Sequence, residues 1–414
     1  MTAAAPVPRD LDLVVFGATG FAGRLVAEHL AQNAPSDLRI GLAGRSVERL
    51  DDVRRALGAA AEAWPLLVVD AGDHGQVNEL ARRTRVVVTT VGPYLRYGMP
   101  LVQACAESGT DYLDLTGEVL FVRDSLERCA EPARATGARI VHSCGFDSIP
   151  SDLAVLLLAE RARADGAGAL EDTAMVVRSM RGGISGGSID SARAMAEVVS
   201  ADRSQIAALL DPYALSPHRE AEPDPGPHPD AAPIRYDASV GAWVGPFVMA
   251  TYNTRVVRLS NALQSWAYGR SFRYREVMAY GADALAPVRA AAASVGVAGA
   301  VLGLAFGPTR ALLDRVLPAP GQGPDERTRR QGGFVTETRT TTTSGAVYRC
   351  LIEASGDPGY QATSVMLGES ALALLLDRDR LPRAAGVLTP ATGIGSVLAD
   401  RLRAAGFVIE VARV

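Results

Sequence analysis

The sequence predicts an α/β protein in which a doubly wound parallel sheet forms the first domain and a second, α+β domain is inserted before the chain returns to the first. Three observations predict this organisation. Residues 1–150 alternate short apolar runs with helical patterns, residues 151–355 mix β-rich runs, helices and long loops, and residues 356–414 return to the first style. Strands separated by helices in this rhythm are typical of parallel sheets.

The stretch LVVFGATGFAGR at residues 13–24 opens the first domain. The apolar run Leu13–Phe16 predicts a buried strand, three glycines punctuate the turn that follows, and helical spacing begins at Phe21. A glycine turn lets the backbone approach a pyrophosphate, and the next helix N-terminus directs free N–H groups at it. The spacing is a variant of the G-x-G-x-x-G fingerprint of Rossmann-type dinucleotide pockets. The expected cofactor contacts are Gly17, Ala18, Thr19, Gly20, Phe21 and Gly23.

The same alternation continues through the first domain. Further strands are expected at residues 38–43, 66–69, 86–91, 110–115 and 138–142. Helical patterns lie between them at residues 47–57, 77–82, 100–108 and 119–136. A parallel sheet with helices on both faces follows from this order.

The second domain and the tail show different patterns. The second domain is expected to contain a strand at 173–180, a glycine turn at 182–188, a helix at 189–199, a surface loop at 211–233 and a hairpin formed by 334–343 and 346–354. The tail is expected to contain helices at 364–376 and 397–405, a turn at 389–396 and a last strand at 407–411. We expect the tail, including that strand, to complete the first domain.

Composition excludes several classes of function. The net charge of −4 over 414 residues gives no general attraction to nucleic acid. The chain contains no lysine, which excludes Schiff-base chemistry and the Tyr-x-x-x-Lys pair. The N-terminal residues have no signal-peptide pattern, so a cytoplasmic protein is expected. The cysteines are scattered and predict neither disulfides nor a metal site; they are Cys105, Cys129, Cys144 and Cys350.

The end of the second strand indicates which nicotinamide cofactor binds. A carboxylate there contacts the ribose 2′-hydroxyl of NAD, whereas an arginine accommodates the 2′-phosphate of NADP. This chain has Arg45 and Ser46 at that point and no carboxylate, so NADPH is expected, although Arg45 is alternatively a solvated loop residue. Asp70 ends the third strand, where it meets the adenine edge or caps the next helix.

Two loops at strand ends carry the candidates for catalysis. The fourth strand runs into Gly92, Pro93 and Tyr94, and ligands of such sheets lie outside the carboxyl ends of the strands. Gly92 and Pro93 are therefore expected beside the cofactor, and Tyr94 is a candidate proton donor or packs over the helix that follows. His142 after the sixth strand is a second candidate, with a structural hydrogen-bonding role as the alternative. The loop after His142 offers further groups that hold substrate or cap a helix: Cys144, Asp147, Ser148, Ser151 and Asp152.

Several motifs occur together in one order: GATGFAG, LAGRS, VGPYLRYG, ACAESGTDYLDLTGE and SCGFDSIPSD, followed by GYQATSVMLGESAL and GVLTPATGIGS near the end. Together they resemble the saccharopine dehydrogenase-like family of oxidoreductases, most strongly over the first 150 residues. The GPYLRYG and GFDSIPSD pairing is similar to its branch of actinobacterial trans-acting enoyl reductases. The resemblance implies NADPH-dependent reduction of a carbon–carbon double bond on a polyketide-derived acyl chain, for a synthase of phthiocerol and phenolphthiocerol lipids. It carries over Gly17, Gly20 and Gly23 for phosphate and Arg45 for the cofactor, and gives no proton donor.

Residues 290–309 bear on the substrate class. This run has no charge and a length close to the ~20 residues that span a bilayer, but its alanines and glycines make it weakly hydrophobic. A buried or interfacial helix, a membrane-surface or lipid-tunnel element, and a true span are the alternatives. The run is compatible with an acyl lipid substrate and a peripheral plasma-membrane position. The resemblance implies a polyketide synthase partner and a homodimer.

Three functions fit the sequence. An enoyl reductase would pass hydride to the β-carbon of an enoyl thioester and polarise the carbonyl through Tyr94 or His142, with Asn253 and Arg255 as weaker candidates. A saccharopine-type amino-acid dehydrogenase would need an arginine cluster for two carboxylates. A non-catalytic lipid-associated protein with a vestigial cofactor fold is the third. The arginines available for the second function are Arg178, Arg181, Arg255, Arg258 and Arg273.

Overall fold

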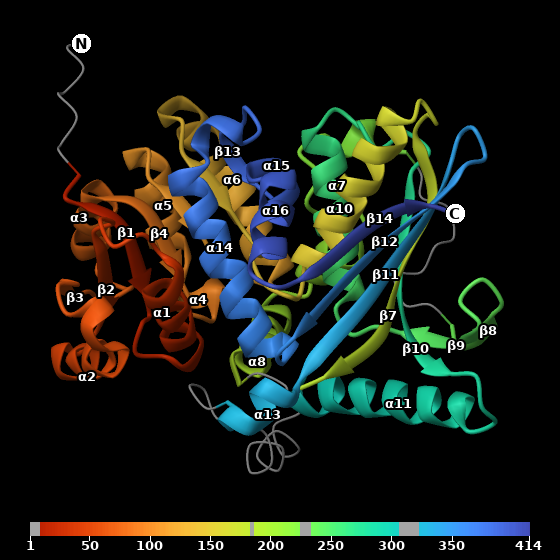
Figure 1. The fold of residues 1–414 in the computed structure, drawn as a ribbon, viewed down its shortest axis with the longest axis horizontal. Coiled ribbons are helices and arrows are strands. Elements are labelled where there is room, and N and C mark those ends of the chain that lie inside the picture. The colour runs from red at the N-terminus through yellow and green to blue at the C-terminus, as the bar shows by residue number, and fades with distance from the viewer. Residues whose placement is uncertain (1–8, 183–185, 224–232, 306–322) are drawn as a thin grey trace.

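The computed structural model describes residues 9–182, 186–223, 233–305 and 323–414. Two seven-stranded sheets, here called sheet A and sheet B, lie on opposite sides of the molecule with helices packed between them (Figure 1). The first third of the chain builds most of sheet A, and the middle of the chain builds most of sheet B. The predicted α/β class, with a doubly wound parallel sheet and a second sheet-containing part, is confirmed.

All strand pairs of sheet A are parallel. Its strands are β1 (Leu11–Phe16), β2 (Ile40–Gly44), β3 (Leu66–Val68), β4 (Thr84–Thr89), β5 (Asp111–Leu113), β6 (Arg139–Val141) and β13 (Gly386–Leu388). Their spatial order is β13-β6-β5-β4-β1-β2-β3. The order reverses between β1 and β4, and that point is where doubly wound sheets bind nucleotides.

Helices cover both faces of sheet A, which explains why its strands are continuously apolar. One face packs against α1 (Phe21–Asn33), α2 (Val47–Leu57) and α14 (Thr363–Leu376), and α16 (Ser396–Ala404) packs on α14. The other packs against α3 (His74–Arg83), α5 (Met99–Ser108) and α6 (Val119–Thr136). Along β1, Leu13 and Val15 enter the first core while Val14 and Phe16 enter the second, as the two-residue repeat of a strand requires.

The tail differs from its prediction at two places. The three-residue strand β13 was not predicted, because Gly386–Leu388 is too short to give a pattern, yet it pairs with β6 and extends sheet A. The last strand, β14 (Val408–Arg413), pairs with sheet B, so the expectation that it completes the first domain is wrong. The predicted turn at 389–396 contains α15 (Pro390–Gly393), which begins with a capping box formed by Thr389 and Thr392. The predicted boundaries near residues 150 and 355 stay predictions.

Sheet B is mixed, with one parallel pair between β7 and β10 and antiparallel pairs elsewhere. Its strands are β7 (Leu170–Arg181), β8 (Arg235–Asp237), β9 (Ala242–Pro246), β10 (Arg273–Gly281), β11 (Gly333–Thr342), β12 (Val347–Ser355) and β14. The order is β14-β12-β11-β7-β10-β9-β8. The predicted hairpin of β11 and β12 is confirmed, and Gly345 in its turn has a φ of 79°, which favours glycine.

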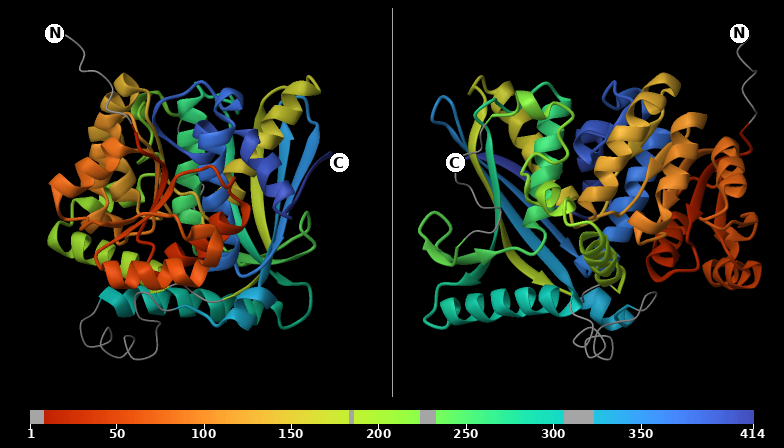
Figure 2. Two further views of the ribbon diagram at one scale, coloured as in Figure 1. Left: turned by 60° about the vertical axis from the view of Figure 1, so that its left-hand side comes forward. Right: turned by 180° about the vertical axis from the view of Figure 1, so that it is seen from behind.

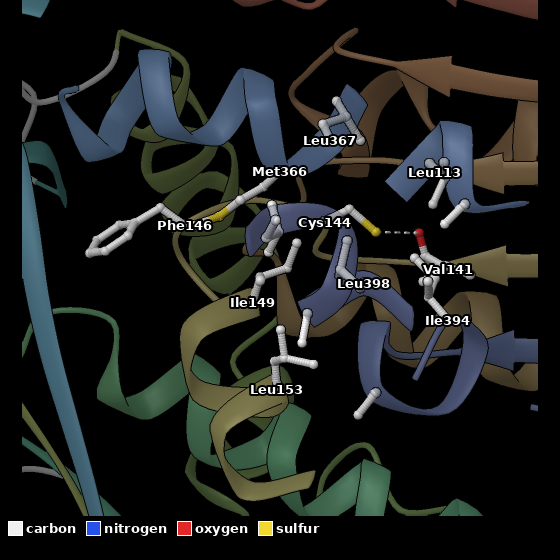
Figure 3. Packing of buried hydrophobic residues seen from close by; sticks show 14 of the residues in the cluster. Leu113, Val141, Cys144, Phe146, Ile149, Leu153, Met366, Leu367, Ile394 and Leu398 are labelled. Carbon is white, nitrogen blue, oxygen red and sulfur yellow. Dashed lines mark hydrogen bonds between the residues drawn. The ribbon is translucent and has the colours of Figure 1, made fainter. Parts of the chain in front are cut away.

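Helices α7 (Ile149–Ala164) and α10 (Ala250–Leu263) lie between the two sheets (Figure 2). Every residue of α7 from Ile149 to Ala159 is buried, because the helix contacts sheet B on one side and α15 and α16 on the other. The core is continuous across this junction: Phe146, Met366 and Leu398 come from distant parts of the chain and belong to one cluster (Figure 3). The two sheets therefore share a hydrophobic core.

The apolar run at 290–309 lies largely within α11 (Ala286–Ala305), and residues 306–309 lie outside the described residues. Parts of the predicted glycine turn (183–185) and of the predicted surface loop (224–232) also lie outside them. Helix α11 runs along one edge of the molecule beside β9, β10 and α8 (Gly186–Ala201) (Figures 1 and 2). Within the described ranges, no helix is long and apolar enough to cross a membrane.

Candidate functional site

The glycine turn after β1 has the geometry of a phosphate cradle. Gly17 has a φ of 90°, a conformation that glycine adopts at low cost. A Cβ on Gly23 would lie 2.2 Å from the carbonyl oxygen of Gly17, so only glycine allows α1 to approach the turn this closely. Gly20 is the N-cap of α1 and provides no side chain to cap the first N–H groups. Helix N–H groups without such a cap favour a bound anion, so these residues fit the pyrophosphate of a dinucleotide.

Phe21 and Ala18 have packing roles at this turn. The Phe21 ring begins α1 and lies 4.6 Å from the ring of Tyr360 in the π-helical turn η3 (Pro358–Ala362). Ala18 is fully buried, and its N–H donates to the carbonyl of Ala43 at 3.2 Å. The turn is thus held between β2 and the tail of the chain, while Thr19 is partly exposed.

The carboxyl end of β2 presents two arginines. Arg45 is exposed directly after β2, as predicted. Ser46 caps α2 by accepting the Arg49 N–H at 3.3 Å, and its hydroxyl donates to Glu48 at 2.8 Å. The Arg49 guanidinium donates to the Thr19 carbonyl at 3.3 Å, which places a second positive charge against the glycine turn. Sequence reasoning missed Arg49; its position one turn into α2 was the available signal. This end of β2 fits a ribose 2′-phosphate.

Asp70 is exposed after β3 and accepts the N–H of Gly72 at 2.9 Å. The alternative prediction that it caps the next helix is wrong, because Asp73 is the N-cap of α3 and accepts the N–H groups of Gly75 and Gln76. The Asp70 carboxylate therefore lies at the edge of the site. Contact with the adenine stays a prediction.

A buried carboxylate accepts hydrogen bonds from the loop after β4. Gly92 and Pro93 lead into the short helix α4 (Tyr94–Tyr97). Glu118 accepts the N–H groups of Tyr94 at 3.0 Å and Leu95 at 2.6 Å. Burial raises the pKa of Glu118 above its usual range. The Tyr94 hydroxyl donates to the Thr89 carbonyl and accepts the Leu115 N–H, both at 3.2 Å. Tyr94 therefore joins the ends of β4 and β5.

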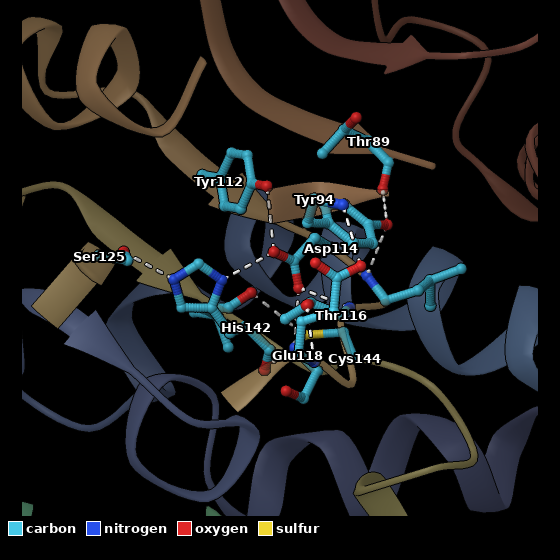
Figure 4. A network of polar contacts seen from close by, with 12 residues as sticks. Thr89, Tyr94, Tyr112, Asp114, Thr116, Glu118, Ser125, His142 and Cys144 are labelled. Carbon is cyan, nitrogen blue, oxygen red and sulfur yellow. Dashed lines mark hydrogen bonds and ion pairs between the residues drawn. The ribbon is translucent and has the colours of Figure 1, made fainter. Parts of the chain in front are cut away.

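His142 belongs to a buried polar network (Figure 4). Its Nδ1 lies 2.7 Å from Asp114 Oδ2 and its Nε2 lies 2.8 Å from Ser125 Oγ, so both ring nitrogens have partners. The imidazole is 2% exposed, and the Tyr112 hydroxyl donates to the same carboxylate at 3.0 Å. The order serine, histidine, aspartate resembles a nucleophile triad, but Ser125 is fully buried within α6. These contacts fit the structural alternative for His142.

The loop after β6 contains a serine with a left-handed backbone. Ser143 has a φ of 66°, its N–H donates to Asp114 at 2.9 Å, and its hydroxyl hydrogen-bonds that of Tyr252 from α10. Residues held in this conformation concentrate at functional sites. Cys144 is fully buried, and burial raises the pKa of its thiol well above the usual range, so it is no nucleophile. The sequence carried no signal for Tyr252.

The candidates from the second domain have structural partners. The Asn253 side chain accepts from Ser148 at 3.1 Å and donates to Glu276 at 2.9 Å, and it is 1% exposed. The buried Arg255 guanidinium donates to the carbonyls of Thr251 and Leu209. Both side chains therefore make their hydrogen bonds within the protein.

Helix α8 covers the strand ends from the second domain. The Ser191 hydroxyl donates to Glu118 at 2.6 Å, and Arg96 of α4 forms an ion pair with Glu197. The walls around the carboxyl ends of β4, β5 and β6 therefore come from α4, α8 and α10. Two cavities of about 410 and 610 Å³ open elsewhere, beside Tyr268 and beside Pro382, and the glycine turn lines neither. We therefore locate the site by the carboxyl ends of the strands of sheet A and not by a cavity.

Comparison with known proteins agrees with this geometry. Residues 13–141 match the family described as the saccharopine dehydrogenase NADP binding domain. The chain is 52% identical to the Mycobacterium tuberculosis protein named "Putative trans-acting enoyl reductase Rv2449c", with 98% of each chain covered. It is 48% identical to the trans-acting enoyl reductase of Mycobacterium ulcerans, also with 98% of each covered. Apo saccharopine dehydrogenase (L-Glu forming) from Saccharomyces cerevisiae shares the fold, with a TM-score of 0.53, 12% identity and coverage of 98% of this chain and 100% of that one.

The fold, the glycine turn and the domain match define an NADP-dependent oxidoreductase built on a saccharopine dehydrogenase-type nucleotide domain. NADPH is the cofactor, as predicted. The chain belongs to the family of the mycobacterial trans-acting enoyl reductases.

Proposed function

We propose that this chain reduces a carbon–carbon double bond of a polyketide-derived acyl chain with NADPH, as a reductase that acts in trans to the synthase. The observation that carries this proposal is the correspondence along the whole chain, at about half identity, with relatives named trans-acting enoyl reductase. An acyl chain of the phthiocerol and phenolphthiocerol type is the substrate that we propose, and a polyketide synthase is the proposed partner.

We propose that the cofactor lies across the carboxyl ends of β1, β2 and β4. The α1 N-terminus with Gly17, Gly20 and Gly23 would hold the pyrophosphate, and Arg45 with Ser46 would hold the 2′-phosphate. We propose the same edge for the other predicted cofactor contacts, which are Ala18, Thr19, Phe21, Asp70, Gly92 and Pro93. NADPH supplies a hydride when bound. The chain's own contribution is to orient the two reactants and to exclude water beneath α8.

Tyr94 and His142 stay our sequence-based candidates for catalysis, but their contacts favour positioning roles. A hydroxyl that already bonds two backbone groups, and an imidazole with both nitrogens paired, have no free site for a substrate carbonyl. We propose that they fix the loops after β4 and β6, which face the substrate.

An amino-acid dehydrogenase of the saccharopine type is the weaker proposal. Two of its five candidate arginines lie apart along the sheet, because Arg273 pairs in register with Asp172 near the start of β7 while Arg178 lies near its end. Arg178 is also bound to Glu337 at 2.8 Å. Arg258 is buried and donates to the carbonyl of Pro212. A vestigial, non-catalytic fold is disfavoured by the close approach of Gly23 to Gly17, which fits a phosphate-binding turn.

We further propose that α11 contacts a lipid surface or the acyl-bearing partner. Its exposed apolar residues Val288 and Val295 are 62% and 73% exposed and lie seven residues apart, on one face of the helix, with Leu285 just before it. Contact with a lipid surface would place the protein at the membrane periphery, and we propose a cytoplasmic location. A homodimer stays a family-based expectation.

The function is tested with purified protein, NADPH and an unsaturated acyl-carrier thioester. We expect loss of NADPH absorbance together with a product heavier by two hydrogens. Turnover with an amino-acid conjugate and not with any enoyl thioester would favour the dehydrogenase proposal. Failure to bind NADPH would favour the vestigial fold.

A further inference from the structure

Asp147 lies in the loop between β6 and α7, at the carboxyl edge of sheet A. The adenosine half of a dinucleotide occupies the edge near β2, so the reactive half lies toward β4, β5 and β6. The neighbours of Asp147 in sequence are fixed: the Phe146 N–H donates to Thr363 at 3.0 Å, and the Ser148 hydroxyl donates to Asn253 at 3.1 Å. The loop therefore holds Asp147 in a defined place.

The carboxyl group of Asp147 differs from the other acids of this edge. Asp114, Glu118 and Asp152 are almost fully buried and hydrogen-bonded. Asp147 is partly exposed and, within the described ranges, has neither a hydrogen bond nor an ion pair. A carboxyl group that has no partner in the fold, on a residue that is only partly buried, is available to a ligand.

Protein atoms nonetheless surround this carboxyl group. Desolvation raises the pKa of Asp147 to about 6, so it carries a proton at higher pH than an ordinary aspartate. Tyr252 of α10 is the titratable group that senses the Asp147 charge, which helps to raise the pKa of Tyr252 together with the charges of Asp114 and Glu118. Tyr252 is a poorer acid, because it is buried, its hydroxyl is bonded to Ser143, and its pKa lies well above the usual range.

We propose that Asp147 is the catalytic acid that protonates the substrate. This inference rests on the proposed enoyl reduction. Bound NADPH would supply the hydride for the β-carbon and leave as NADP⁺, and the double-bond electron pair would move toward the thioester carbonyl as an enolate. The Asp147 O–H proton would then form the C–H bond at the α-carbon, and the Asp147 carboxylate would regain a proton from water.

The test compares Asp147→Asn, Asp147→Glu and a control, Asp124→Asn, whose side chain is 44% exposed on α6. We expect Asp147→Asn to lower kcat by roughly 10²–10⁴-fold, the usual contribution of a general acid, with NADPH affinity unchanged by fluorescence titration. Asp147→Glu should restore part of the rate, and Asp124→Asn should behave as wild type. In D₂O, wild-type product should carry one deuterium at the α-carbon.

A second readout does not depend on turnover. Infrared difference spectra of the wild type should show a carboxyl group titrating near pH 6 that is absent from Asp147→Asn. The wild-type rate should fall above that pH, and the variant should lose this dependence. If Asp147→Asn keeps the wild-type rate, or if Tyr252→Phe alone abolishes it, the assignment is overturned. If the wild type reduces no enoyl thioester at all, the proposed function fails, and the acid role fails with it.

Discussion

Gly23 lies against Gly17 so closely that a Cβ on Gly23 would come within 2.2 Å of the Gly17 carbonyl oxygen. The contact joins the first turn of α1 to the loop that would surround the pyrophosphate. Since the clashing atom is backbone, the helix must shift if a side chain is introduced.

We therefore expect Gly23→Ala to weaken NADPH binding by at least tenfold, because the shift misdirects the helix N–H groups. Isothermal titration calorimetry measures this directly. Gly137→Ala, at a helix end where no atom lies within 4 Å of the added Cβ, serves as a control for a glycine remote from the site. Its φ of 81° predicts some loss of stability with unchanged NADPH affinity. Equal NADPH affinity of Gly23→Ala and wild type would contradict the interpretation of the glycine turn as a phosphate cradle.

Arg45→Ala should raise the Kd for NADPH by roughly 10–100-fold and leave that for NADH almost unchanged, since a charge-assisted hydrogen bond to the 2′-phosphate contributes about 1.5–3 kcal/mol. Arg49→Ala should show the same selectivity to a smaller extent, because its guanidinium already bonds Thr19. Arg55→Ala, an exposed arginine on the same helix, is the matched control. A parallel loss for both cofactors would mean that Arg45 does not contact the 2′-phosphate.

Tyr94→Phe should lower the free energy of unfolding by about 1–3 kcal/mol, because the N–H of Leu115 and the carbonyl of Thr89 lose a buried partner. We expect kcat per folded molecule to change less than threefold. Urea denaturation and steady-state kinetics on the same samples separate the two effects. Tyr97→Phe, with a side chain 44% exposed, controls for loss of a hydroxyl. A large fall in kcat without destabilisation would restore Tyr94 as a catalytic residue.

Asp152 gives a prediction about pH and stability. Its carboxylate accepts the Ala391 N–H at 2.8 Å and the Ser260 hydroxyl, and burial raises its pKa to about 6. The folded state therefore binds the proton more tightly than the unfolded state. The stabilisation that comes from this tighter proton binding is present below about pH 4 and is lost as pH rises through about 6.

Between those pH values the wild type should lose on the order of 3 kcal/mol relative to Asp152→Asn, which has no charge to desolvate. Urea denaturation of both proteins across this range measures the difference, in which most other titrations cancel. If the free energies of unfolding of the two proteins change in parallel with pH, Asp152 loses its proton at the same pH in the folded and unfolded states.

The exposed face of α11 is tested by replacing Val288 and Val295 with glutamate. We expect wild-type protein to float with anionic lipid vesicles and the double variant to stay behind, because two charges oppose burial in the interface. Leu210→Glu, at a 74% exposed position on α9 (Gln205–Leu210), is the control. Wild-type protein that does not float would exclude the lipid contact.

The sequence by itself determined six of the seven strands of sheet A, the helices between them, the glycine turn and the NADPH preference. Each depends on local chemistry: apolar runs, glycine spacing, and an arginine at one strand end. It also predicted the β11–β12 hairpin, whose strands are neighbours in the chain.

Tertiary structure alone decided which sheet each short or distant strand joins. Strand β13 has three residues and β14 pairs with a strand more than fifty residues earlier, so no local pattern specifies either pairing. The same holds for the acids. Asp114, Glu118, Asp147 and Asp152 look alike in the sequence. Packing pairs three of them and leaves Asp147 without a partner among the described residues, because burial and hydrogen-bond partners arise only when α7, α10 and sheet A meet.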